Sequence, residues 1–188
     1  MMISRDKALS KQILAYHRIP TAKFALLPRN RRYREPSRLK FPLFVKSATE
    51  DASLGISQAS IVHDGQKLSE RVQFIHEQTN SDALVEEYIE GRELYVGILG
   101  NQRLQALPVW ELSFAKMPEE SRQIATERLK WSLAYQKKHG IDSGAAELEP
   151  ASALAMQELC KRSYKILMMS GCARIDLRLS PEGRAYVI

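Results

Sequence analysis

Three groups of residues along this 188-residue chain carry side chains suited to handling phosphates. Lys46 ends an apolar stretch and precedes a loop of small residues, where backbone N–H groups and a cation could wrap phosphate oxygens. The run 86–93 holds four carboxylates across a predicted hairpin corner, of which Glu86 and Glu93 could accept from a base amino group and from sugar hydroxyls. Arg174 and Asp176 lie two apart on a predicted strand, so a cation and a metal-capable carboxylate share one face.

Each group also has a simpler interpretation. A lysine at a strand end is often only solvated, a charged corner is often only a turn, and Arg174 with Asp176 can form an ordinary cross-strand ion pair. Other common signatures are absent from the sequence, including GxxxxGK[ST], GxGxxG after a strand, and GxSxG. The four histidines have no metal-ligand spacing, and Cys160 and Cys172 have no activating neighbour, which indicates surface histidines and buried cysteines.

The elements that must position these residues follow from capping and periodicity. A helix is predicted over about 6–18, capped by Ser4 and ended by Ile19-Pro20. Strands are predicted at 24–27, 41–46, 58–63 and 83–89, with a polar basic loop at 28–40, a turn at Asp64-Gly65 and a helix at 69–78. Lys46 and the acidic run thus both fall at strand ends.

The second half continues with strands at 93–99 and 103–112, followed by the least periodic stretch, 113–150. A helix capped by Ser152 and stopped by Gly171 is predicted next, its apolar face formed by Ala155, Leu159, Ile166 and Leu167. Residues 172–179 alternate as a strand, a turn follows at 180–183, and 184–188 begin a return strand. Hairpins mixed with isolated helices predict an α+β fold.

Composition excludes several classes of protein. With 44% hydrophobic residues the chain can build one or two small domains with a real core, which excludes disorder. Two cysteines cannot frame a disulfide scaffold. The first residues turn polar too soon for a signal peptide, and no apolar run is long enough to span a bilayer. These features favour a reduced, cytoplasmic protein without a membrane partner.

The positive charge is local. Residues 1–40 hold 11 Lys+Arg and 2 Asp+Glu, so the remaining residues hold 17 (28 − 11) and 20 (22 − 2). Binding of RNA or DNA through the basic stretch 29–40 is one hypothesis, but only Tyr33 and Phe41 supply aromatic partners for base stacking. A solvated linker is the favoured interpretation, so nucleic acid is not the expected partner.

In this order, the three groups resemble the ATP-grasp superfamily, and most closely its D-alanine–D-alanine ligase-like branch. The matching stretches are 44–57, 85–93 with 97–100, and 173–177. Residues 6–9 leading to 18–21 look like the start of the ATP-grasp unit, and 127–131 look like the mobile segment that closes over the triphosphate. The resemblance implies two α+β subdomains with mostly antiparallel sheets around a nucleotide cleft, divided here as 1–89 and 90–188.

The activity that the resemblance implies is an ATP- and Mg²⁺-dependent carboxylate–amine ligase. A carboxylate attacks the γ-phosphate, and an amine then displaces phosphate from the acyl phosphate. Carried over by position, Lys7 and Lys46 would hold the α- and β-phosphates, Glu86 the adenine amino group, the backbone of Tyr88 and Ile89 the adenine edge, and Glu93 the ribose. Ser53 would cover the phosphates, Lys130 would reach the γ-phosphate, Asp176 would bind Mg²⁺, and Arg174 would stabilise the acyl phosphate.

Three departures from the family pattern qualify this expectation. Asp51 and Ala52 stand where the phosphate loop usually has a glycine and a serine. The family's second metal carboxylate and a nearby asparagine are expected just after Ile188, and the ligases carry a further N-terminal domain. The sequence is therefore predicted to represent an excised or incomplete ATP-grasp domain.

Two alternatives remain open at this point. One is a non-catalytic module that binds nucleotide without turnover. The other is a ligase that adds an amino acid such as glutamate to a peptide or a protein terminus. The expected partners are ATP and small amino-acid or peptide substrates, and the family usually forms homodimers.

Overall fold

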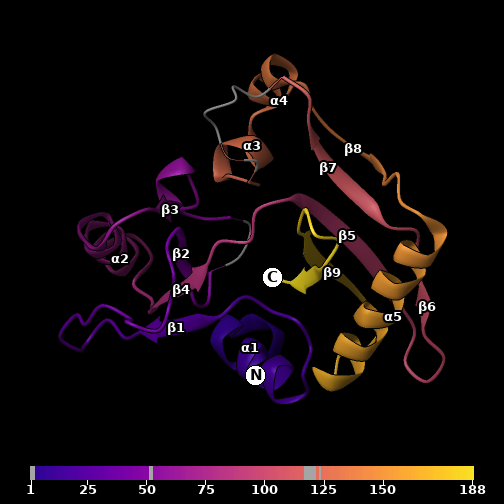
Figure 1. The fold of residues 1–188 in the computed structure, drawn as a ribbon, viewed down its shortest axis with the longest axis horizontal. Helices are drawn as coiled ribbons and strands as arrows, with labels where there is room; N and C mark the ends of the chain where they lie inside the picture. The colour runs from indigo at the N-terminus through magenta and orange to yellow at the C-terminus, as the bar shows by residue number, and fades with distance from the viewer. Residues whose placement is uncertain (1–2, 51–52, 117–121, 123) are drawn as a thin grey trace.

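Two antiparallel sheets, each covered by a helix, make up the two halves of the molecule (Figure 1). The computed structural model describes residues 3–50, 53–116, 122 and 124–188, without the side chain of Lys130. The first sheet has the order β1-β4-β2-β3 and is covered by α2 (Gly65–Thr79). Its strands are β1 (Phe24–Leu27), β2 (Leu43–Ser47), β3 (Ile61–Val62) and β4 (Ala83–Glu87).

The second sheet has six strands in the order β10-β9-β5-β7-β8, with β6 paired to β5. They are β5 (Arg92–Leu99), β6 (Gln105–Ala106), β7 (Trp110–Phe114), β8 (Ile141–Ala145), β9 (Cys172–Leu179) and β10 (Ala185–Val187). Central strands β5 and β9 pair antiparallel along their whole length, from Arg92–Leu179 to Leu99–Cys172. This long pairing fixes Glu93 beside Arg178 in register, which matters for the site.

Alternation along β5 builds the core of the second half. Leu94, Val96 and Ile98 are fully buried against α5 (Pro150–Ile166), as expected for one face of a period-two strand. Tyr164 of α5 is buried in the same cluster, and its hydroxyl donates to the carbonyl oxygen of Gly100 at 2.7 Å. The helix is thus fixed both by apolar packing and by one polar bond.

We expect Tyr164→Phe to lower the free energy of unfolding by about 1 kcal/mol, because the Gly100 carbonyl loses its donor while the packing stays. Urea denaturation at pH 7 measures this change. The matched control is Tyr16→Phe, since the Tyr16 side chain is exposed and its loss of a hydroxyl is expected to be neutral. Equal stabilities for the two variants would contradict the role given to this bond.

Helix α1 (Lys7–Tyr16) lies between the two sheets (Figure 1). Ala8 packs with the first sheet and Leu14 with the core of the second. The predicted cap, Ser4, is wrong: it lies in a 3₁₀ turn (Ile3–Arg5), and Asp6 accepts from the Leu9 N–H at 2.9 Å instead. The strands divide between Glu87 and Arg92, whereas α1 contacts both halves, and the subdomain division at 89–90 stays a prediction.

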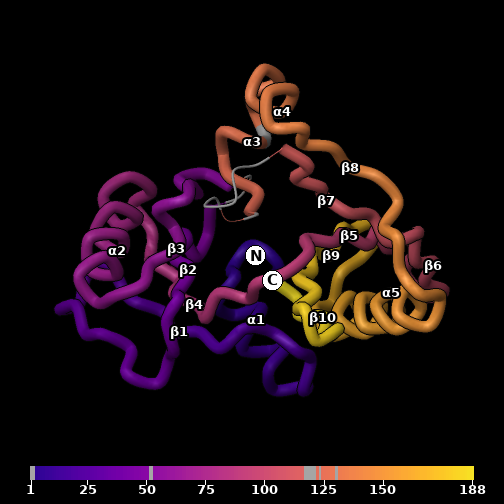
Figure 2. Tube along the Cα trace, turned by 45° about the horizontal axis from the view of Figure 1, so that its top comes forward, coloured from indigo at the N-terminus to yellow at the C-terminus, as the bar shows by residue number. Residues whose placement is uncertain are grey.

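A second link joins the halves beside α1. Thr21 forms a parallel bridge with Val187 of β10, and the Val187 N–H donates to the Pro20 carbonyl at 2.9 Å. The Thr21 hydroxyl also donates to the Val187 carbonyl at 2.8 Å. Figures 1 and 2 both place the C-terminal end of the chain between the two sheets. Early and late segments of the chain therefore meet at the centre of the molecule.

Two predicted strands are partly wrong. Residues 58–63 begin as a 3₁₀ turn (Gln58–Ser60), and only Ile61 and Val62 pair as a strand. Residues 103–112 split into β6 and the start of β7, with Pro108 between them, which cannot donate a ladder hydrogen bond. The predicted turn at Asp64 is instead the N-cap of α2, its carboxylate accepting from the Lys67 N–H at 2.8 Å.

The long C-terminal helix is correctly predicted, and Leu159, Ile166 and Leu167 of its predicted apolar face do pack into the core of the second half, but its boundaries and the placing of Ala155 are wrong. It begins at Pro150 rather than after Ser152 and ends at Ile166, before Gly171. Ala155 is exposed, and the buried stripe runs through Met156, Cys160, Ser163 and Tyr164. The aperiodic stretch 113–150 contains α3 (Glu127–Trp131), α4 (Leu133–His139) and β8. In the described part of the chain, no helix is long and apolar enough to cross a membrane.

Candidate functional site

A cavity of about 400 Å³ lies between the two sheets and is lined from both. Nine of the ten site residues predicted from the sequence line it: Lys7, Lys46, Ser53, Glu86, Tyr88, Ile89, Glu93, Arg174 and Asp176. The tenth, Lys130, lies in α3, and its side chain falls outside the described residues, as do Asp51 and Ala52. Residues from Lys7 to Asp176 are thus brought together around one cavity, although their individual roles stay predictions.

Glu86 forms the electrostatic centre of one cavity wall. Its Oε1 lies 2.7 Å from Nζ of Lys46, and its Oε2 lies 2.8 Å from Nζ of Lys11. All three side chains are buried, and Lys11 also donates to the Thr21 hydroxyl at 2.6 Å. Lys46 lines the cavity, whereas Lys11 lies behind Glu86 on α1. Lys46 thus presents its ammonium group to the cavity beside a carboxylate that it shares with a second lysine, which suits an anionic ligand.

Burial raises the pKa of the Glu86 carboxyl, but the charges of Lys11 and Lys46 outweigh it and lower that pKa to about 2. Burial acts in the opposite sense on Lys11 and lowers its pKa, against the raising effect of Glu86. The carboxylate is therefore charged throughout the neutral range, and the three groups act as one unit. The sequence analysis missed Lys11, because a polar residue on a predicted helix gives no sign of a partner 75 positions away.

Arg174 and Asp176 are bonded to each other across one face of β9. The guanidinium donates in a bidentate manner, from Nε to Oδ1 at 2.7 Å and from Nη2 to Oδ2 at 2.9 Å. The hydrogen bonds to Asp176 raise the pKa of Arg174. The guanidinium also stacks over the Tyr95 ring, 4.5 Å from its centroid. The side-by-side placement expected from a spacing of two is present, and both side chains line the cavity.

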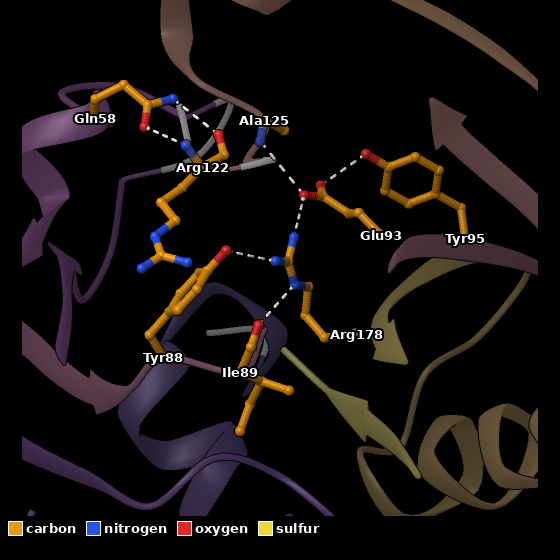
Figure 3. Close-up of polar contacts among 8 residues, drawn as sticks. All are labelled: Gln58, Tyr88, Ile89, Glu93, Tyr95, Arg122, Ala125 and Arg178. Atoms are coloured by element: carbon orange, nitrogen blue, oxygen red, sulfur yellow. Dashed lines mark hydrogen bonds and ion pairs between the residues drawn. The ribbon is translucent and has the colours of Figure 1, made fainter. Parts of the chain in front are cut away.

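Glu93 accepts from three donors that belong to three different segments (Figure 3). The Tyr95 hydroxyl donates to Oε1 at 2.8 Å, while the Ala125 N–H and Nη1 of Arg178 each approach Oε2 at 3.3 Å. Burial and the nearby Glu93 charge raise the pKa of Tyr95. The carboxylate is 7% exposed, so these contacts set its orientation inside the cavity.

Arg178 was not predicted as a site residue. It is 4% exposed, lines the cavity and contacts Glu93, Tyr88 and Ile89, all of which the sequence analysis singled out. Its only sequence signal is its place on β9, on the same alternating face as Arg174 and Asp176. That face is opposite the core-facing Ile175 and Leu177, so the alternation alone gives no sign that Arg178 is buried against partners.

The loop that follows Lys46 closes the cavity on one side. Ser53 and Gly55 both have positive φ, at 61° and 71°, which turns the backbone sharply around the cavity edge. Nζ of Lys7 donates to the carbonyl of Glu50. The Gly55 N–H donates to Oε2 of Glu127 at 2.9 Å, and the Glu127 N–H donates to the Ile56 carbonyl at 3.0 Å. The loop and the start of α3 are therefore held together.

The segment linking the two sheets also lines the cavity. The Tyr88 N–H donates to the Pro42 carbonyl at 3.0 Å, and the Ile89 carbonyl accepts from Nε of Arg178 at 3.1 Å. The Tyr88 N–H is thus engaged within the protein, while the Ile89 carbonyl keeps a second lone pair for a ligand.

The described residues do not by themselves supply enough ligands to hold a metal ion. Among them no group of three or more His, Cys, Asp or Glu side chains is arranged to hold one. Mg²⁺ at nucleotide sites needs only one or two carboxylates beside phosphate oxygens. Asp176 is one such carboxylate at the cavity, so the residues fit Mg²⁺ only together with a bound phosphate.

Two facing antiparallel sheets with a lysine-lined cavity between them define an ATP-grasp unit, and solved structures show the same fold. The chain belongs to the family described as "D-ala D-ala ligase C-terminus", whose model matches residues 13–188. The D-alanine–D-alanine ligase of Bacillus anthracis, solved in complex with ATP, is 25% identical with a TM-score of 0.75 over 99% of this chain and 54% of that one.

Proteins of similar sequence support the same family assignment. Protein y4sG of Sinorhizobium fredii is 31% identical over 99% of this chain and 52% of its own length. The D-alanine–D-alanine ligase of Pelotomaculum thermopropionicum is 26% identical over 99% of this chain and 57% of its own length. The chain thus spans about half the length of the curated relatives that it matches.

Proposed function

We propose that this chain is the nucleotide-binding and catalytic part of an ATP-dependent carboxylate–amine ligase that joins small amino acids or peptides. The observation that carries the proposal is the shared cavity, in which Lys7, Lys46 and Arg174 converge with the carboxylates Glu86 and Glu93. Similarity to a ligase solved in complex with ATP supports the choice of nucleotide.

In this proposal the chain's own residues position the reactants and neutralise charge. Lys46, held by Glu86, and Lys7 receive the α- and β-phosphates, and Lys130 reaches the γ-phosphate. Glu86 accepts from the adenine amino group, the backbone at Tyr88 and Ile89 faces the adenine edge, Ser53 covers the phosphates, and Glu93 accepts from the ribose. Phosphoryl transfer requires mainly this kind of positioning, with little covalent help from the protein.

Arg174 is proposed to act at the end of the site where the substrate carboxylate and the amine react. Its guanidinium stabilises the negative charge that develops when a substrate carboxylate becomes an acyl phosphate and when an amine adds to it. Asp176 is the residue that would hold Mg²⁺ beside the phosphates, and the ion would add further charge neutralisation there. In the structure Asp176 is bonded to Arg174, so release of this pair accompanies ligand binding in the proposal.

Calorimetric titration with ATP in the presence of Mg²⁺ tests the proposal. We expect the wild-type chain to bind, and Lys7→Met to raise the Kd about 10-fold or more, since a charge-assisted bond to phosphate is lost. The matched control is Lys67→Met, because Lys67 is exposed on α2 and is outside the residues that line the cavity. A folded wild-type chain that binds no ATP, or equal affinities in the two variants, would count against the proposal.

A module that binds nucleotide without turnover is the second candidate, favoured by the engagement of Asp176 with Arg174. Phosphate release from ATP in the presence of D-alanine or glutamate separates the two. Release that depends on the amino acid supports ligation, whereas binding without release supports the module.

A further inference from the structure

Arg178 contacts residues of the cavity wall that come from different segments of the chain (Figure 3). Nε donates to the Ile89 carbonyl at 3.1 Å, Nη2 donates to the Tyr88 hydroxyl at 2.8 Å, and Nη1 approaches Oε2 of Glu93 at 3.3 Å. Tyr88 and Ile89 belong to the segment that crosses from one sheet to the other, whereas Glu93 belongs to β5. One side chain thus fixes the crossing segment and the carboxylate relative to each other.

Only a guanidinium can make this set of contacts. Arginine presents five N–H donors in a rigid planar fork, while lysine presents a compact ammonium on a flexible stem. The three acceptors take their hydrogen bonds from three different nitrogens of the Arg178 fork, and the guanidinium carbon is 5.3 Å from the Tyr88 ring centroid. Charge alone would therefore not reproduce the arrangement.

The contacts of Glu93 restrict what it can still accept. A carboxylate has about four lone-pair positions, and donors from Tyr95, Ala125 and Arg178 use three of them. Among the contacts of the described residues one position remains, and the other three set its direction. Arg178 also offsets the negative charge of Glu93, which removes a repulsion that a polyphosphate ligand would otherwise meet in the cavity.

We propose that Arg178 is a positioning residue that orients Glu93 toward the ribose hydroxyls of a nucleotide, and so makes the cavity selective for nucleotides with an intact ribose. This inference rests on the proposed function, because it presupposes that a nucleotide occupies the cavity. It adds a residue that acts through Glu93 and not on the nucleotide directly.

The test compares ATP with 2′,3′-dideoxy-ATP by calorimetric titration. We expect the wild-type chain to bind ATP about 10-fold or more tightly than the dideoxy nucleotide, because one hydrogen bond from a hydroxyl to a buried charged group separates them. Arg178→Met is expected to reduce this ratio to below about 3-fold. Arg178→Lys is expected to behave like Arg178→Met, since it keeps the charge and loses the fork.

The ratio distinguishes positioning from a purely structural role. A general disturbance of the fold weakens the binding of both nucleotides equally and leaves the ratio of their Kd values unchanged. Misorientation of Glu93 weakens only the binding of ATP, which carries the ribose hydroxyls. Glu93→Gln combined with Arg178→Met is expected to change the ratio no more than Glu93→Gln alone, because coupled residues are not additive. Arg162→Met, at an exposed position of α5, is the matched control and keeps the wild-type ratio.

A milder variant guards against misfolding. Tyr88→Phe removes one of the anchors of Arg178 and is expected to lower the ratio about 2-fold with the fold intact. An unchanged ratio in both Arg178→Met and Tyr88→Phe, or a wild-type chain that does not discriminate between the nucleotides, would overturn the inference. A folded wild-type chain that binds neither nucleotide would instead overturn the proposed function, and this inference with it.

Discussion

Glu86→Leu is expected to lower the free energy of unfolding by about 3–5 kcal/mol, the range observed when one partner of a buried ion pair is removed. The substitution leaves Lys11 and Lys46 facing each other, both buried and without the carboxylate that joins them. In a chain of this length such a loss corresponds to a fall in Tm of about 6–20 °C. Differential scanning calorimetry at pH 7 measures it.

The neighbouring carboxylate supplies the control. Glu87 lies next to Glu86 on β4 and is more exposed. Its Oε1 accepts from the Lys40 N–H at 3.0 Å at an exposed position and lies 4.0 Å from Nζ of Lys23, so Glu87→Leu is expected to cost only about 1 kcal/mol. Dependence on pH provides a second measurement. The pKa of Glu86 is lowered in the folded state, so its stabilisation is complete above about pH 4.5 and is lost as the pH falls toward 2. A wild-type acid transition no steeper than that of Glu86→Leu would refute this role.

Lys46→Met is expected to raise the Kd for ATP about 10- to 100-fold, with a much smaller loss of stability than Glu86→Leu. Lys46 lines the cavity and carries the positive charge that is proposed to bind phosphate. Its removal is therefore expected to weaken the binding of the nucleotide. Glu86 then still pairs with Lys11 at 2.8 Å, which keeps the buried carboxylate compensated. Calorimetric titration with ATP and thermal unfolding of the same samples measure the two effects.

Lys23→Met is the matched control for this variant. Lys23 is 68% exposed in its side chain and is outside the residues that line the cavity, so ATP affinity is expected to stay at the wild-type value. Unchanged affinity in Lys46→Met, or a stability loss as large as that of Glu86→Leu, would show that Lys46 serves the fold and not the ligand.

Sequence reasoning was most successful where the information is local. Alternation along 172–179 correctly predicts that Ile175 and Leu177 are buried while Arg174 and Asp176 lie on the other face. Most candidate site residues lie at strand ends or on strand faces, whereas Lys7 lies on α1, Lys130 on α3 and Ser53 in a loop, and their common site was expected from the resemblance to a family and not from local pattern. The identity of the fold came from the order of these motifs and is confirmed by the solved relatives.

What sequence reasoning missed depends on contacts between distant segments. Lys11 reads as a polar helix position, and only the fold brings it to Glu86. Arg178 reads as an outward residue of an alternating strand, and its burial results from the segment that crosses above it. The buried face of α5 was predicted only in part: Leu159 and Ile166 pack against the core as expected, but the apolar residues spread around the helix, and packing against β5 selects Met156 and Cys160 over Ala155.

The bond between Thr21 and Val187 has a consequence for the order of events during synthesis. It joins residues 166 positions apart, so it cannot form until nearly the whole length described here has left the ribosome. Lys11, Lys46 and Glu86 are available to one another much earlier, whereas Arg174, Asp176 and Arg178 arrive on the late strand β9. Contacts of such long range also slow folding, because the intervening loop must close first. Under the proposed function, capture of a nucleotide is therefore expected only after β9 and β10 have docked, and it would report directly that they have done so.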